Sequence, residues 1–371
     1  MKIKVLEAFG EPISYGGQEA FIMNVLEHLD RSGLEIDFLT PYYCDNDRHA
    51  AAVREYGGEV YALGCSFNPG GIRNNTIRPI RDFLRSHSYD VIHIHSGSNS
   101  MLAVFSALAA AAGIPRIIVH SHSTGIQGWK HNLSKLLTEP VLRRCPTDYC
   151  SCSEEAGIWR FPADICKERL QIIYNGIEVR DFEYDEKRRA EIRASLGLGP
   201  DDVVIGNIGR LVYQKNQQFL IEILERLVHD RQKGTGEYRL LLVGGGEDHG
   251  RLEALAEELG VSDKVMITGP RNNVSDYYQA IDILAVPSQY EGFGMVVIEG
   301  QAAGLDVLVS DRVPRIADVT GAVTFIPIED RDAWIAAVRS EHLRHPENSI
   351  KVADSGFNAE YAAATVRKMY I

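Results

Sequence analysis

Short apolar runs of strand length recur along the whole chain and alternate with segments that carry a helical hydrophobic period. The runs of the first half lie at 2–8, 36–39, 60–63, 91–94, 117–119 and 147–151, and a second series covers 203–209, 240–243, 265–269, 283–286, 307–310 and 323–326. Strands that alternate with helices predict parallel, doubly wound sheets covered by helices on both faces. The 371 residues suffice for two such α/β domains.

The boundary between the two series predicts the domain organisation. We expect a first Rossmann-like domain at 1–177, an interdomain linker at 178–200, a second Rossmann-like domain at 201–355 and a C-terminal helix within 356–371. The stretch 178–199 is polar and charged and is followed by Pro200, a composition typical of a hinge.

The most informative stretch is 282–304, DILAVPSQYEGFGMVVIEGQAAG. Its apolar start predicts a strand at 283–286, which Pro287 ends, and the apolar positions after the glycines predict a helix from about Met295. Gly292, Phe293 and Gly294 form a loop whose backbone N–H groups, with the first free N–H groups of the helix, can bind an anion or hydroxyl groups.

Two carboxylates frame this loop, Glu291 before the glycines and Glu299 about one turn into the helix. Both can face the carboxyl end of the strand, where a carboxylate is a good acceptor for the vicinal hydroxyls of a sugar. Taken singly, Glu291 is also consistent with an ordinary loop charge and Glu299 with a first-turn acid favoured by the helix dipole.

Two basic residues follow the first strand of the second domain in VVIGNIGRLVYQKN. Arg210 offers a planar fork of donors and Lys215 a mobile point charge, the combination expected where a diphosphate leaving group is held. As isolated surface charges they carry no such meaning.

Two glycine turns are weaker signals. Gly16 and Gly17 follow the first strand, and Gly244 follows the strand at 240–243. A dinucleotide fingerprint at 244–249 would need glycine at 249, where the chain has His249, so NAD binding is not predicted.

Histidines at alternate positions close two strands of the first half, His93 with His95 and His120 with His122. Alternate residues on a strand share a face, so each pair could hold a metal or line a cleft. Two Asp-x-Asp sequences, at 45–47 and 330–332, have the spacing of a metal–diphosphate motif, but the second lies at a predicted helix start, where Asp is a common cap. We predict no metal and no other cofactor.

The sequence EGFGMVVIE at 291–299 resembles the E-x7-E motif of retaining GT-B glycosyltransferases, in particular glycosyltransferase family 4, and the likeness is greatest to bacterial capsular and exopolysaccharide enzymes. The resemblance implies that Glu291 contacts the transferred sugar and that Glu299 holds the ribose. It also implies that the backbone of Phe293, Gly294, Met295 and Val296 meets sugar hydroxyls and diphosphate.

Further roles follow from the same resemblance. Arg210 and Lys215 fit the family's G-R-x4-K pattern for the diphosphate, and the remaining implied donor contacts are made by Gly16, Gly17, Gly244 and, near the nucleobase, Arg271. A first-domain histidine, His122 before His120, is expected beside the transferred sugar. The final helix is expected to return to the first domain, and the two domains to face each other across a cleft.

These implications define the expected function. The chain is predicted to be a retaining, metal-independent glycosyltransferase of EC class 2.4 that moves a sugar from a nucleotide diphosphate, with uridine favoured, to a hydroxyl of a glycan or lipid-diphosphate-linked acceptor. The reaction is expected to take place on one face of the sugar, with a phosphate oxygen taking the acceptor proton. A GT-B sugar-nucleotide epimerase and a non-catalytic sugar-nucleotide-binding protein are the alternatives.

Charge and hydropathy limit the partners and the compartment. The net charge of −12 argues against nucleic acid as a partner. No apolar stretch reaches the length of a membrane span, and the start of the chain does not read as a signal peptide, so a cytoplasmic protein is expected. Peripheral contact with an anionic membrane is a further expectation, based on Arg73, Arg78, Arg81 and Arg85 and on the basic, leucine-bearing stretch 129–144.

Overall fold

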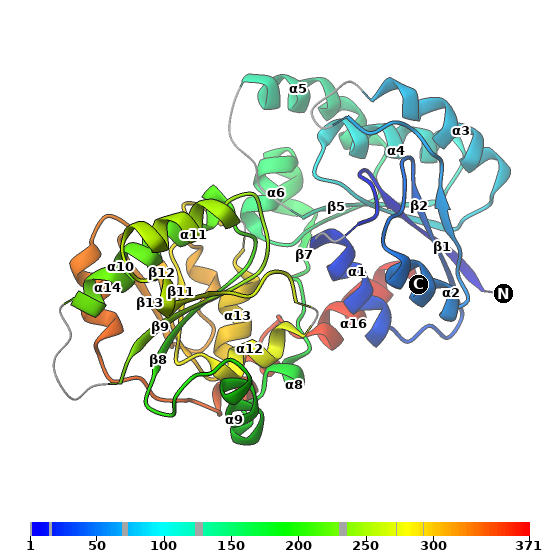
Figure 1. Ribbon diagram of the computed structural model, residues 1–371. Coiled ribbons are helices and arrows are strands. Elements are labelled where there is room, and N and C mark those ends of the chain that lie inside the picture. Colours follow the sequence, from blue (N-terminus) through cyan, green and yellow to red (C-terminus); the bar gives the residue numbers. More distant parts are fainter. Residues whose placement is uncertain are drawn as a thin grey trace. The chain divides into compact units, whose positions relative to one another are not determined.

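The computed structural model describes residues 2–14, 17–68, 73–122, 129–229, 236–271, 273–291 and 293–371. Two compact units result, residues 1–176 together with 359–371, and residues 177–358. Each unit is built on one parallel sheet with helices on both faces (Figure 1). The α/β class predicted from the alternating pattern is confirmed.

The first unit has a seven-stranded sheet in the order β3-β2-β1-β4-β5-β6-β7. Its strands are β1 (Ile3–Phe9), β2 (Leu34–Thr40), β3 (Val60–Ala62), β4 (Val91–His95), β5 (Arg116–Ser121), β6 (Asp148–Ser151) and β7 (Leu170–Ile172). Its helices are α1 (Gly17–His28), α2 (Asp47–Glu55), η1 (Asn74–Thr76), α3 (Ile77–Ser86), α4 (Asn99–Ala111), α5 (Trp129–Arg144), α6 (Glu154–Arg160), α7 (Ala163–Glu168) and α16 (Ala359–Tyr370).

The two faces of this sheet bury separate hydrophobic clusters because successive residues of a strand point to opposite faces. Val5 of β1 belongs to the cluster that includes α1 and α16, whereas Leu6 belongs to the cluster that includes α3 and α4. The last helix, α16, lies beside α1, so the end of the chain completes the first unit (Figure 1).

The second unit has a six-stranded parallel sheet in the order β10-β9-β8-β11-β12-β13. Its strands are β8 (Val203–Ile208), β9 (Tyr238–Val243), β10 (Val265–Ile267), β11 (Ile283–Val286), β12 (Asp306–Ser310) and β13 (Val323–Ile326). Its helices are α8 (Val179–Phe182), α9 (Glu186–Ser195), η2 (Tyr213–Lys215), α10 (Gln217–His229), α11 (His249–Glu258), η3 (Ser262–Lys264), α12 (Val274–Ala280), α13 (Met295–Ala302), η4 (Arg315–Ala317), α14 (Arg331–Val338) and α15 (Asn348–Asp354).

The central strand of the second unit is β11, which pairs with β8 on one side and β12 on the other. All four of its residues are buried, as expected for a parallel strand covered on both faces. The structure begins and ends this strand where the apolar run does, and it starts α13 at Met295, as the sequence predicts.

The stretch 178–200 differs from the sequence expectation of a linker. It contains α8 and α9 and groups with the second unit. Arg189 and Arg193 of α9 both bind the carboxylate of Asp282, at 2.5 Å and 3.2 Å, and these half-buried to buried ion pairs fix the helix to the start of β11. The charged residues Arg189 and Arg193, which favoured a solvated hinge in the sequence, therefore attach α9 to the second unit.

Candidate active site

Two loops meet at the carboxyl ends of the neighbouring strands β8 and β11. The N–H of Gln289 donates to the carbonyl of Gln214 (2.8 Å), and the side-chain amide of Asn216 donates to the carbonyl of Pro287 (3.2 Å). Asn216 has a left-handed backbone (φ 56°), which Asn tolerates better than most residues with a Cβ. These bonds hold the segment that carries Lys215 against the segment that carries Glu291.

The loops place a lysine and a carboxylate in direct contact. Nζ of Lys215 lies 2.6 Å from Oε1 of Glu291, and the hydroxyl of Ser288 donates to the same oxygen (2.7 Å). The Glu291 side chain is only 6% exposed and that of Lys215 17%, so the pair is poorly screened by water. Oε2 of Glu291 and two donors of Lys215 have no hydrogen-bond partner among the described residues, so both groups retain capacity for a ligand.

Glu299 lies in the second turn of α13 and is oriented by a tyrosine of α12. The hydroxyl of Tyr278 donates to Oε2 of Glu299 at 2.5 Å. Burial raises the pKa of Glu299, while the Tyr278 hydroxyl and the positive charge of Lys215 act in the opposite direction. The positive charge of Lys215 therefore acts on both carboxylates of the motif.

The loop between the two carboxylates ends in a glycine-specific turn. Gly294 caps α13 with a left-handed backbone (φ 86°), and its carbonyl accepts from the N–H of Val297 (2.8 Å). The N–H groups of Met295 and Val296 belong to the first turn and have no intrahelical acceptor. The Phe293 side chain is buried against Phe357, with ring centroids 5.0 Å apart, so only its backbone is available to a ligand. Gly292 lies outside the described residues.

Arg210 contributes an unpaired positive charge beside this site. It follows β8, its side chain is exposed, and its guanidinium forms no ion pair with any described residue. Gly209, immediately before it, has φ 149°, and a Cβ there would lie 3.5 Å from Cε of Lys215. An available guanidinium in the segment that carries Lys215 fits the predicted diphosphate role.

The structure gives Gly244 a packing role. A Cβ at Gly244 would lie 2.0 Å from the carbonyl oxygen of Gly209, so the ends of β8 and β9 can approach only with glycine there. Its N–H already donates to the carbonyl of Gly269 (3.1 Å) and is not free to bind a diphosphate. Arg271 is exposed beyond β10.

The predicted histidines form one buried cluster in the first unit. His93 Nε2 lies 3.1 Å from His120 Nδ1, and His95 Nδ1 lies 2.8 Å from His122 Nε2. His120 is fully buried on β5, whereas His122, just after β5, is partly exposed. Part of His122 is therefore accessible to a ligand, whereas its ring nitrogens are not: Nε2 is bonded to His95, and Nδ1 is buried. Of the predicted glycine loop, Gly17 opens α1, and Gly16 lies outside the described residues.

Ring nitrogens of His93, His95 and His120 lie within 4.8 Å of one another, a spacing that a metal ion can bridge. Hydrogen bonds already occupy this cluster, however: His93 with His120, and His95 Nε2 with Glu7 Oε2 (2.8 Å). We therefore assign no metal ligands here. The Asp-x-Asp sequence at 330–332 is explained by structure, because Asp330 caps α14 and Asp332 pairs with Arg226.

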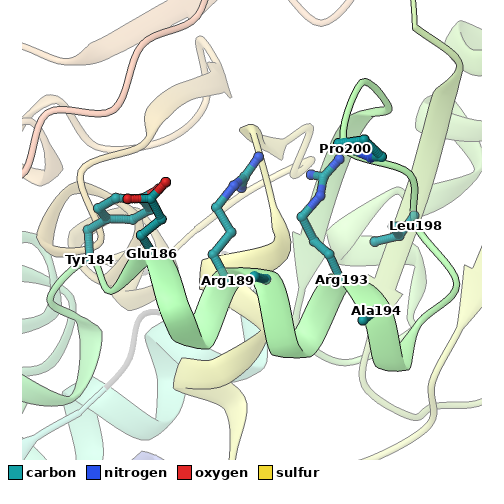
Figure 2. Close-up of a pocket in the computed structure, with 8 residues that line it drawn as sticks. Tyr184, Glu186, Arg189, Arg193, Ala194, Leu198 and Pro200 are labelled. Carbon is teal, nitrogen blue, oxygen red and sulfur yellow. The ribbon is translucent and has the colours of Figure 1, made fainter.

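A pocket of about 320 Å³ lies beside α9 (Figure 2). It is lined by Tyr184, Glu186, Arg189, Ala190, Arg193, Ala194, Leu198 and Pro200. Figure 2 shows Arg189 and Arg193 projecting from the same side of the helix, and both bind Asp282 at the amino end of β11. Ligand sites of open α/β sheets form at the carboxyl ends of strands, so the Glu291 loop, and not this pocket, is the candidate active site.

Comparison with known proteins identifies the class. Residues 15–181 match the model of Glycosyltransferase Family 4, and residues 188–340 match that of Glycosyl transferases group 1. A D-inositol 3-phosphate glycosyltransferase of Mycobacterium sp. (strain KMS) is 32% identical over 389 residues, covering 92% of this chain and 79% of the relative. The chain belongs to glycosyltransferase family 4 and is a glycosyltransferase.

Other relatives agree. EpsF of Bacillus subtilis (strain 168), provisionally named a glycosyltransferase, is 27% identical over 370 residues, covering 96% of this chain and 93% of EpsF. Anabaena HepE, solved in complex with UDP, has a TM-score of 0.75 at 16% identity and covers 99% of both chains. WaaG, a glycosyltransferase involved in lipopolysaccharide biosynthesis, has a TM-score of 0.67 at 19% identity over 97% of this chain and 95% of its own. The GT-B fold is thereby confirmed.

Proposed function

We propose that this glycosyltransferase transfers a sugar, with retention of anomeric configuration and without a metal, from a nucleotide diphosphate to a hydroxyl of a glycan or lipid-linked acceptor in polysaccharide biosynthesis. The observation that carries the proposal is the contact of Lys215 with Glu291 beside the start of α13, with Glu299 one turn further along. A cation suited to a diphosphate and carboxylates suited to sugar and ribose hydroxyls converge there.

The proposed chemistry assigns a role to each group. Arg210 and Lys215 bind the diphosphate and offset the charge that develops as it leaves, together with the N–H groups at the start of α13. Glu291 is engaged by Lys215 and Ser288, so it positions the sugar and does not serve as a nucleophile. The acceptor hydroxyl then attacks on the face from which the diphosphate departs, and a phosphate oxygen takes its proton.

UDP is the proposed leaving group. HepE, which shares the fold, was solved with UDP and with UDP-glucose. A donor screen by thermal shift, followed by a transfer assay, tests this proposal: a UDP-sugar is expected to raise Tm, and transfer is expected to persist in EDTA. Activity that EDTA abolishes and Mn²⁺ restores would contradict the metal-free mechanism. Donor turnover to an isomeric sugar nucleotide without acceptor would favour an epimerase, and binding without turnover a sensor.

Glu299→Gln is expected to weaken donor binding by about 1–3 kcal/mol, because the neutral amide loses a charge-assisted hydrogen bond to the ribose. Isothermal titration calorimetry with the donor measures the effect. Glu258→Gln, at an exposed position of α11, is the matched control and is expected to bind the donor as the wild type does. Equal donor affinity in Glu299→Gln and wild type would refute the assignment.

Peripheral membrane contact is a separate proposal, carried by α5. Leu133, Leu136 and Leu137 of this helix are 46%, 67% and 69% exposed, an unusual exposure for neighbouring leucines. Three of the four arginines named for this contact, Arg78, Arg81 and Arg85, lie on α3, whereas Arg73 lies outside the helix and donates to the carbonyl of Gly10 (2.7 Å). No helix in the described part of the chain is long and apolar enough to cross a membrane.

Flotation with anionic vesicles at low salt tests the contact. The wild type is expected to float, and Leu136→Ser combined with Leu137→Ser is expected to remain in the dense fraction because the apolar face is lost. Leu343→Ser, at an equally exposed leucine of the second unit (60%), is the control and is expected to float. A wild type that does not float would end this proposal.

A further inference from the structure

Glu7 of β1 is a fully buried carboxylate at the centre of the histidine cluster. Its side chain is 0% exposed, and both of its oxygens accept hydrogen bonds. Neither of the two chains of hydrogen bonds that start from it was apparent in the sequence, because their members come from β1, β4, β5 and α16. Each chain ends on a ring nitrogen of a histidine that was predicted to serve the reaction.

The first chain runs through Tyr370 to His120. The hydroxyl of Tyr370 donates to Oε1 of Glu7. His93 Nδ1 lies 2.8 Å from that hydroxyl and 3.4 Å from Glu7 Oε2, and His93 Nε2 lies 3.1 Å from His120 Nδ1. Nε2 of His120 is buried and has no hydrogen-bond partner among the described residues.

The second chain runs through His95 to His122. His95 Nε2 lies 2.8 Å from Glu7 Oε2, and His95 Nδ1 lies 2.8 Å from His122 Nε2. The remaining nitrogen, His122 Nδ1, is again buried and lacks a hydrogen-bond partner within the described part of the chain. We call His120 Nε2 and His122 Nδ1 the outer nitrogens.

The charge state of Glu7 fixes the direction of both chains. An ionised carboxylate only accepts, and a neutral imidazole has one donor and one acceptor nitrogen. Burial lowers the pKa of His93 and of His122 to about 3 and that of His95 and His120 well below the usual value, so all four rings are neutral. Every N–H then points toward Glu7, and both outer nitrogens are left as bare acceptors.

We propose that Glu7 is a positioning residue that sets the tautomers of His120 and His122 through these two chains, so that ionised Glu7 leaves both outer nitrogens as acceptors and holds the His122 ring in the orientation proposed for its contact with a bound sugar. The statement about the sugar rests on the proposed function, whereas the statement about tautomers does not. A protonated Glu7 must donate into one chain, which reverses that chain and turns its outer nitrogen into a donor.

This reversal falls in an accessible pH range. Burial raises the pKa of Glu7 to about 8, against a smaller opposing effect of the Tyr370 hydroxyl. Glu7 is therefore ionised above that value and protonated below it. The titratable and charged groups around the cluster are His93, His95, His120, His122, Cys150, Arg160 and Tyr370.

Long-range ¹H–¹⁵N spectra of the histidine rings report each tautomer directly, and single substitutions assign the signals. In the wild type at pH 9.5 we expect His95 and His122 to carry the proton on Nε2, and His93 and His120 to carry it on Nδ1. Lowering the pH through about 8 is expected to convert one of the two pairs to the other tautomer. A His122 that carries its proton on Nδ1 at pH 9.5, or that is doubly protonated, would overturn the proposal.

Glu7→Gln keeps the shape but places an NH₂ donor in the cluster, so one pair is expected to be reversed at every pH. Tyr370→Phe interrupts only the first chain and is the control, in which His122 keeps its proton on Nε2. Identical ring spectra of Glu7→Gln and the wild type at pH 9.5 would contradict the proposal, and the pH series on the wild type tests it even if a variant does not fold.

Measurements of glycosyl transfer test the proposed link between Glu7 and the reaction. At pH 9.5, where Glu7 is ionised in the wild type, Glu7→Gln is expected to lower kcat about 10-fold with donor affinity within about 2-fold of wild type, because the residue acts on orientation and not on donor binding. Tautomers that follow Glu7 while kcat stays unchanged would refute the link to the reaction. Absence of glycosyl transfer in the wild type with every donor would instead refute the proposed function and leave the tautomer result intact.

Discussion

Lys215→Ala is expected to lower kcat by about 10²-fold or more, the usual scale for the loss of one preorganised electrostatic group. The substitution removes the cation proposed to offset charge on the departing diphosphate. It also leaves Glu291, whose side chain is 6% exposed, with the Ser288 hydroxyl but without its counter-charge. Steady-state kinetics with saturating donor and acceptor measures the change.

The comparison with other basic residues makes this result specific. Lys187→Ala, at an exposed lysine of α9 that pairs only loosely with Glu191 (3.8 Å), is the matched control and is expected to retain wild-type kcat. Arg210→Ala is expected to lower kcat as Lys215→Ala does, because the free guanidinium of Arg210 is assigned to the same leaving group. A Lys215→Ala enzyme with wild-type kcat would remove the diphosphate role from this lysine.

The part of the site that the sequence predicts is the part that is local along the chain. The strand at 283–286, the turn at Gly294 and the helix start at Met295 lie within thirteen residues, and an apolar run, a proline and two glycines determine them. The same holds for the parallel α/β class, because it follows from a repeated short pattern.

The partners that orient the proposed site residues could not be predicted, because they come from distant positions. Tyr278, 21 residues before Glu299, lies on another helix, and Gln214 lies 75 residues before Gln289. Nothing in the spacing of these residues records the contact. At Gly244 the sequence signal had a different cause. This glycine turn resembles a phosphate-binding turn, but the structure needs it for the close approach of β8 and β9.

Strand ends were also harder to predict where polar side chains are buried. The apolar run ends at Val119, but β5 continues to Ser121, because His120 and Ser121 are both fully buried and both hydrogen-bonded within the first unit. A polar residue after an apolar run therefore did not mean that the strand had ended or that the polar side chain was exposed.

The residues proposed to hold the donor, Arg210, Lys215 and Glu299, all belong to the second unit, whereas His122 belongs to the first. His122→Ala is therefore expected to lower kcat by about 10²-fold and to change donor affinity by less than about 2-fold, because a lost positioning contact affects the transition state more than donor binding. Stopped turnover assays measure kcat, and calorimetry on the same preparation measures donor affinity.

Two further variants decide which histidine acts. His87→Ala, at a histidine of the first unit outside the buried cluster, is the control and is expected to be fully active. His120→Ala is expected to reduce the free energy of unfolding, because it removes a fully buried ring that packs edge-on against Phe21, with centroids 4.9 Å apart. A folded but inactive His120→Ala beside a fully active His122→Ala would move the sugar contact two residues back along the chain, and full activity in both would make these histidines purely structural.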